Sequence, residues 1–164
     1  MMTNKRTALF SSEKLLSCSA DGINNEISAL NAVIAQRGLF LTQNDVREIV
    51  RVRTRALTDN CRFEVGIGSI EKITESLLPS PFVNRSNFAE TLCTFLSIFY
   101  YIKTASFDSI SDEDVIRILK DTYENVCYGS LGEMRGKEVE MILGYIRSEK
   151  KKKQEETGKS EVNG

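Results

Sequence analysis

The stretch from Asn87 to Lys103 constrains the fold of this chain more than any other part of the sequence. It reads NFAETLCTFLSIFYYIK, and on a helical wheel of about 100° per residue its apolar side chains cover well over half of the circumference. The remaining polar side chains form one narrow strip: Glu90, Thr94, Ser97 and Tyr101. A helix with so wide an apolar surface is normally enclosed by other elements. The sequence therefore predicts a central core helix over about residues 87–103.

Helix-start signals on both sides of this stretch predict further helices. Thr42, Ser111 and Ser130 each precede an acidic side chain that falls in the first turn of an expected helix. Residues 62–67 alternate between apolar and other side chains, but no second segment offers a strand for them to pair with. We interpret them as an extended lead-in to a helix over 69–78. We therefore expect an all-α, single-domain bundle of five to seven helices around the central helix.

The two ends of the chain differ in character from the middle. We expect residues 1–11 to be poorly ordered, followed by a short helix that starts at Ser12 and breaks at Asp21-Gly22. Residues 12–148 then form the single helical domain. Residues 149–164 are rich in Lys and Glu without apolar periodicity, so they predict a disordered tail.

Composition excludes several classes of function. The net charge is −1, so no global field favours nucleic acid or a membrane. The chain has no histidine, and its four cysteines (18, 61, 93 and 127) are widely separated, which is unlike paired zinc ligands. We therefore expect no metal and no cofactor. No export signal or membrane-spanning run is present, so we expect reduced thiols and a cytoplasmic location.

Arg53 is the least expected polar residue, because it lies in the middle of the apolar stripe of the helix predicted to start at Thr42. A buried guanidinium needs a partner, and Glu64 and Glu71 follow in the next elements. One hypothesis is a recessed Arg–carboxylate site for a small anionic molecule. The alternative is a structural ion pair that ties two helices together, which we favour.

Two other surfaces are candidate sites. Arg47, Arg51 and Arg55 share one helix face and could follow a nucleic-acid backbone, although a solvated basic face is the simpler interpretation. The polar strip of the central helix, with Glu90 and Tyr101 among its residues, could line a cleft or contact a partner helix.

The order and spacing of several segments resemble a known family. These segments are LTQNDVREIVRVRTRAL, RFEVGIGSIEKITESLLPSPFV, NFAETLCTFLSIFYYIK, SISDEDVIRILK and CYGSL. Together, over roughly residues 39–131, they resemble small bacterial proteins of the Firmicutes type that are known as a domain of unknown function. The resemblance implies a soluble single-domain protein and supplies no activity, cofactor or functional residue.

These observations favour a non-catalytic helical module that binds a protein partner or associates with itself. The absence of a recognisable catalytic set also favours a role other than that of an enzyme. The alternative is a protein or enzyme that binds a small anionic ligand near Arg53, Glu64 and Glu71.

Overall fold

The computed structural model describes residues 20–160, and every regular element in that range is helical. The predicted segment 1–11 and the predicted start of a helix at Ser12 lie outside the described residues. In chain order the elements are α2 (Ala20–Ile34), the 3₁₀ helix η1 (Ala35–Arg37), α3 (Gln43–Asp59), α4 (Gly68–Leu77), α5 (Phe88–Ala105), α6 (Asp112–Asp121), the π-helix η2 (Thr122–Val126), α7 (Leu131–Met134) and α8 (Glu138–Ser160). The predicted all-α bundle is confirmed.

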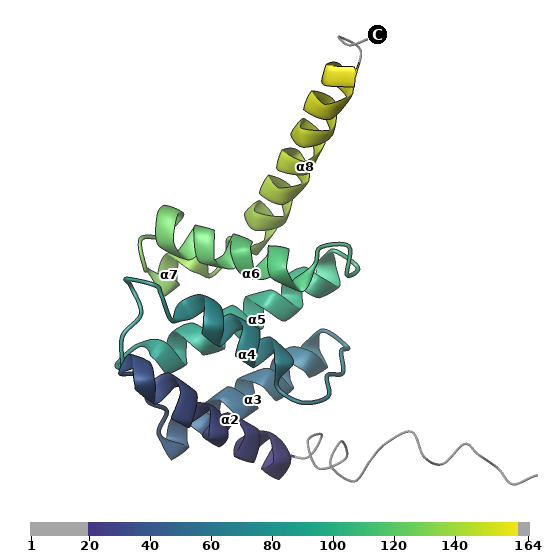
Figure 1. Cartoon of the computed structure of the whole chain (residues 1–164). Coiled ribbons are helices and arrows are strands. Elements are labelled where there is room, and N and C mark those ends of the chain that lie inside the picture. The colour runs from purple at the N-terminus through teal and green to yellow at the C-terminus, as the bar shows by residue number, and fades with distance from the viewer. Residues whose placement is uncertain (1–19, 161–164) are drawn as a thin grey trace, which may run out of the picture.

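The central helix of the bundle is α5, as its sequence predicts (Figure 1). α3, α4, α6 and the first part of α8 all pack against it. Phe88, Leu92, Phe95, Leu96 and Ile102 of α5 are completely buried. Burial of so many large apolar side chains supplies the main favourable free energy for this fold.

The helix starts predicted at Thr42 and Ser111 are confirmed by their hydrogen bonds. The Thr42 hydroxyl accepts from the Asp45 amide at 3.1 Å, and the Asp45 carboxylate accepts from the Thr42 amide at 2.7 Å. These two bonds form a complete capping box at the start of α3. The Ser111 hydroxyl accepts from the Asp114 amide at 3.1 Å and caps α6.

Two details of the predicted helices are wrong. α2, which spans Ala20–Ile34 of the described residues, runs through Asp21-Gly22, where we expect a break. Ile23 and Ile27 are buried in this helix, and such packing outweighs the cost of one glycine. The start predicted at Ser130 is confirmed, because the Ser130 hydroxyl accepts from the Glu133 amide at 3.3 Å and caps α7. The expected single helix is instead divided into α7 and α8, because the chain turns at Gly136 with φ +92°.

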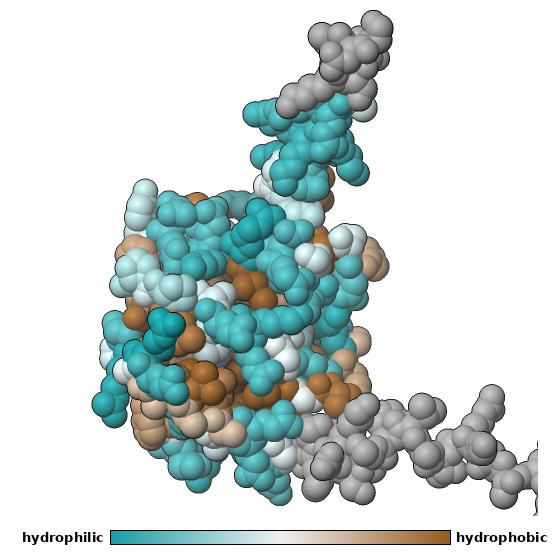
Figure 2. Space-filling view, viewed as in Figure 1, coloured by the Kyte–Doolittle hydropathy of each residue, from teal (hydrophilic) through white to brown (hydrophobic). Residues whose placement is uncertain are grey.

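The predicted disordered tail is also wrong for residues 149–160, which continue α8 as a helix. Lys, Glu and Gln are good helix formers, and Lys152 bonds to Glu149 at 2.9 Å one turn away. This end of α8 stands clear of the body (Figure 1), and its surface is almost entirely hydrophilic (Figure 2).

No helix within residues 20–160 is both long enough and apolar enough to cross a membrane.

Candidate functional site

A groove runs along α5, with α3 on one side and the start of α8 on the other. It consists of two adjoining hollows with volumes of about 540 and 680 Å³. Val52 of α3, Ser97 and Ile98 of α5, and Glu138 of α8 line both hollows, so the hollows are continuous. We call this feature the α5 groove.

The floor of the α5 groove is the polar strip that the sequence singles out. Glu90, Thr94 and Ser97 line the first hollow, and Ser97 and Tyr101 line the second. The structure therefore brings the candidates Glu90 and Tyr101 to one surface, and the Tyr101 side chain is 41 % exposed. This side of α5 is left open because the other helices cover its remaining sides.

Arg135, in the turn between α7 and α8, links this turn to α5 at one end of the groove. Its guanidinium donates to the Glu90 carboxylate at 3.1 Å and to the Thr94 hydroxyl at 3.2 Å. Both bonds tie the start of α8 to the floor of the groove. Since Arg135 and Glu90 are largely exposed, this ion pair contributes little to stability and mainly shapes the surface.

The first hollow is acidic. Four carboxylates line it, and among the described residues that do so Arg135 alone is basic. The four carboxylates belong to Asp45, Glu48, Glu90 and Glu138. The surroundings also affect the Cys93 thiol. Its burial raises its pKa to about 12, and the nearby Glu48 carboxylate adds to this effect. Arg51 pairs with Glu48 and Arg135 with Glu90, so the net negative charge of the hollow comes from Asp45 and Glu138. This net charge favours a ligand with positive charge.

The basic face of α3 lies beside the second hollow, and its charges are partly compensated. Arg51 donates to Glu48 at 2.8 Å, and Arg55 lies 3.5 Å from Asp59. Arg47 donates to the Asn44 side chain at 3.3 Å. Because two of the three guanidinium groups have a carboxylate partner on α3 itself, the face is a weak match for a nucleic-acid backbone.

Arg53 is buried, as its place in the apolar stripe predicts, with 6 % of its surface exposed. Its Nη2 donates to the backbone carbonyls of Glu64 and Gly66 at 3.0 and 2.8 Å. Its Nε has no hydrogen-bond acceptor among the described residues. Arg53 thus anchors the loop between α3 and α4, and its partners are main-chain carbonyls rather than carboxylates.

The two carboxylates proposed as partners of Arg53 lie elsewhere. The Glu64 carboxylate accepts from the amide and hydroxyl of Ser69 at the start of α4, each at 3.1 Å, and from the Tyr100 hydroxyl. Glu71 is exposed on α4, and no ion pair joins it to Arg53. Glu64 therefore occupies the position at the helix start where a bound anion would lie.

A third hollow of about 240 Å³ adjoins Glu64, and three cations line it. Arg62 bonds to Asp108 at 2.7 Å, while Lys103 and Lys72 each lie 3.1 Å from Asp112. All three cations that line this hollow therefore have a carboxylate partner. The arrangement fits a structural charge network between α4, α5 and α6 better than a site for a small anion.

The described residues contain no cluster of three or more metal-ligating side chains.

Fold and groove together define the class of protein: an all-α, single-domain bundle with an open groove beside its central helix. The chain belongs to DUF6323, a family of unknown function whose family model matches residues 26–152. This confirms the resemblance to a domain of unknown function. No curated protein and no solved structure matches the chain.

Sequence reasoning identified the floor of the groove but missed its walls. Glu48, Arg135 and Glu138 line it from α3 and from the start of α8. No motif connects these three residues, and only the packing of α8 beside α5 brings them together.

Proposed function

We propose that this protein is a non-catalytic interaction module that binds a helix with basic side chains in the α5 groove. The observation that carries the proposal is the position of the polar strip of α5, which forms the floor of the groove instead of facing another helix of the bundle. A groove between two helices is a common receptor for an amphipathic helix.

The shape and charge of the groove support this choice of ligand. The side chains of its floor span residues 89–101, about 18 Å at a rise of 1.5 Å per residue, which accommodates three turns of helix. Val52 and Tyr101 offer exposed apolar surface, and the acidic first hollow favours basic side chains.

The test is an NMR titration of the ¹⁵N-labelled protein with two model amphipathic helices, one built from Leu and Lys and one from Leu and Glu. We expect the Lys peptide to shift the amide signals of Ser97 and Tyr101, with weaker binding at high salt. A Ser97→Trp variant, which fills the floor where both hollows meet, should lose the interaction. Failure of both peptides to bind, or shifts confined to another surface, would contradict the proposal.

We propose further that the protein acts in the cytoplasm of a bacterium. Support comes from Cys61, Cys93 and Cys127, which are free thiols. The resemblance described from the sequence supports the bacterial origin.

A further inference from the structure

We propose that the helix bound in the α5 groove is α8 of a second copy of this chain, so that the protein forms a symmetric dimer. The inference rests on the proposed function and names its partner. Three features of α8 carry it: an exposed apolar stripe, a basic end that stands clear of the body, and an acidic surface at its own base.

The apolar stripe consists of Val139, Leu143 and Ile146, whose exposed fractions are 55, 44 and 42 %. Their spacing of i, i+4 and i+7 places them on one face of the helix. Met141 and Tyr145 project from the other face toward the body, and Met141 is buried. α8 therefore presents apolar surface on two sides, and the body covers only one of them.

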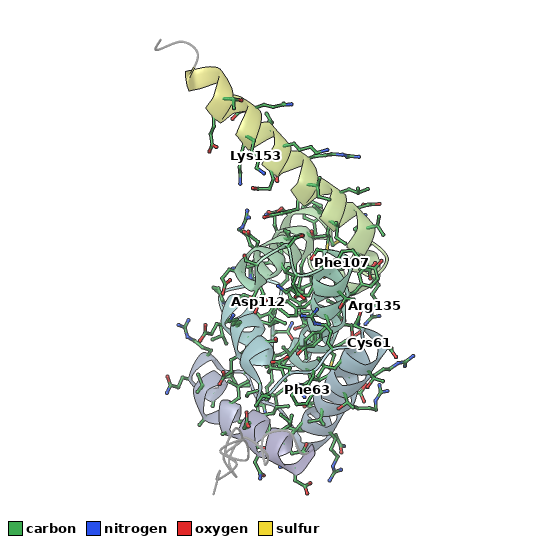
Figure 3. All side chains as sticks on the ribbon, turned by 90° about the vertical axis from the view of Figure 1, so that its right-hand side faces the viewer. Cys61, Phe63, Phe107, Asp112, Arg135 and Lys153 are labelled. Atoms are coloured by element: carbon green, nitrogen blue, oxygen red, sulfur yellow. The ribbon has the colours of Figure 1, made fainter. Side chains whose placement is uncertain are left out.

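The basic end of α8 contains four consecutive lysines at positions 150–153, and residues 150–157 are all exposed. Lys151 and Lys152 pair with Glu155 and Glu149 of the same helix, so Lys150 and Lys153 carry the charge argument. Lys153 lies on the part of the helix that projects into solvent (Figure 3). A short helix without tertiary contacts is marginally stable in water. Contact with another surface would stabilise it.

Charge complementarity identifies that surface. Glu138 lies at the base of α8 and lines the same acidic hollow as Glu48 and Glu90. Lys150 follows Glu138 by twelve residues, about 18 Å along a straight helix, so the lysines of one chain cannot reach the acidic hollow of that same chain. A second chain can supply them.

An antiparallel arrangement brings all three features together. When two copies of α8 cross with a two-fold axis at the level of Gly144, Lys150 of each copy lies level with Glu138 of the other. The same axis places Ile146 of one copy level with Ile142 of the other, and Ile142 is partly buried against the body of its own chain. One symmetric contact thus covers Leu143 and Ile146 of both copies, while Val139 lies level with Glu149 of the partner. The same contact brings each basic end to the level of the acidic hollow of the partner.

The test is sedimentation velocity on the full chain over a range of concentrations, with two charge-reversal variants. The groove variant is Glu90→Lys/Glu138→Lys, and the tail variant is Lys150→Glu/Lys153→Glu. We expect the wild type to dimerise, and each variant alone to associate at least about tenfold more weakly because like charges then face each other. An equimolar mixture of the two variants should dimerise again, since both halves of the mixed interface are complementary.

A second variant pair tests the apolar stripe independently of the charges. Leu143→Asp should reduce dimerisation by at least about tenfold, whereas the matched control Val33→Asp, at an exposed apolar position on α2, should leave it unchanged. Circular dichroism verifies that each variant keeps its helical content, and this pair still tests the interface if a charge variant does not fold.

Three results would overturn the inference: a wild type that stays monomeric at all concentrations, a dimer insensitive to both reversals, or a mixture that remains monomeric. If the wild type is monomeric but the Leu–Lys peptide still shifts the groove signals, the second-copy inference fails while the proposed function stands. If that peptide also fails to bind, the proposed function fails as well.

Discussion

Arg53→Met tests whether the buried guanidinium stabilises the fold. Methionine keeps the apolar stem of the side chain, so the core around it should not acquire a large cavity. The change removes the hydrogen bonds to the carbonyls of Glu64 and Gly66, at 3.0 and 2.8 Å. It also removes the Nε group that has no acceptor among the described residues.

These two effects oppose each other, and their magnitudes decide the outcome. A carbonyl left without its donor costs about 1–3 kcal/mol, and since both carbonyls here are only partly buried we take about 1.5 kcal/mol each. Removing a cation that is incompletely bonded recovers roughly 1 kcal/mol. We expect a net loss of about 2 kcal/mol in the free energy of unfolding, measured by urea denaturation followed by circular dichroism.

Arg47→Met is the matched control, because Arg47 is exposed on the same helix and donates only to Asn44. It should change the free energy of unfolding by less than about 0.5 kcal/mol. The reasoning would be refuted if Arg53→Met were as stable as the wild type or more stable. In that case the cost of burying the guanidinium exceeds what its hydrogen bonds contribute.

Three further predictions concern the core, the charge network and the thiols. Phe95→Ala removes a completely buried ring and should lower the free energy of unfolding by about 3–5 kcal/mol, measured by urea denaturation. The same truncation at an exposed side chain should change this free energy little. Burial opposes ionisation of Asp112, but the ammonium groups of Lys103 and Lys72 together outweigh it and lower the pKa of the carboxyl in the folded state. Stability should therefore be intact above the ordinary pKa of 3.8 and fall as the pH drops below it, with a shallower fall in Asp112→Asn during acid titration followed by circular dichroism. Burial raises the pKa of the Cys93 thiol to about 12, so this thiol should react slowly. In a Cys18→Ser background, a disulfide reagent at pH 8 should therefore modify the exposed Cys61 before Cys93. Equal rates of modification at Cys61 and Cys93 would contradict this.

The sequence was a good guide wherever a short-range rule determines the structure. Thr42 and Ser111 start helices because their hydroxyls accept from amides three residues further along the chain. The apolar surface of residues 87–103 was sufficient to identify the core helix, and the polar strip with Glu90 and Tyr101 identified the side of that helix that stays open.

Other features depend on contacts between distant segments. The partners of Arg53 are carbonyl groups in a loop, and carbonyls carry no signature in a sequence. Glu64 meets Tyr100 across 36 positions, which no spacing rule predicts. The disorder predicted for residues 149–160 was wrong for a different reason. The prediction used only the lack of apolar periodicity, whereas Lys and Glu side chains one turn apart stabilise a helix.

Photo-crosslinking can show directly whether the α5 groove receives α8 of a second copy. A benzoylphenylalanine placed at position 101, on the floor of the groove, would be activated in a mixture of ¹⁴N- and ¹⁵N-labelled protein. Mass spectrometry then distinguishes links between chains from links within one chain, and a probe at position 33 on α2 serves as the control. We predict mixed-isotope products that join position 101 to residues 139–153. Products that lie entirely within one chain, or that join the groove to another surface, would contradict the proposed dimer.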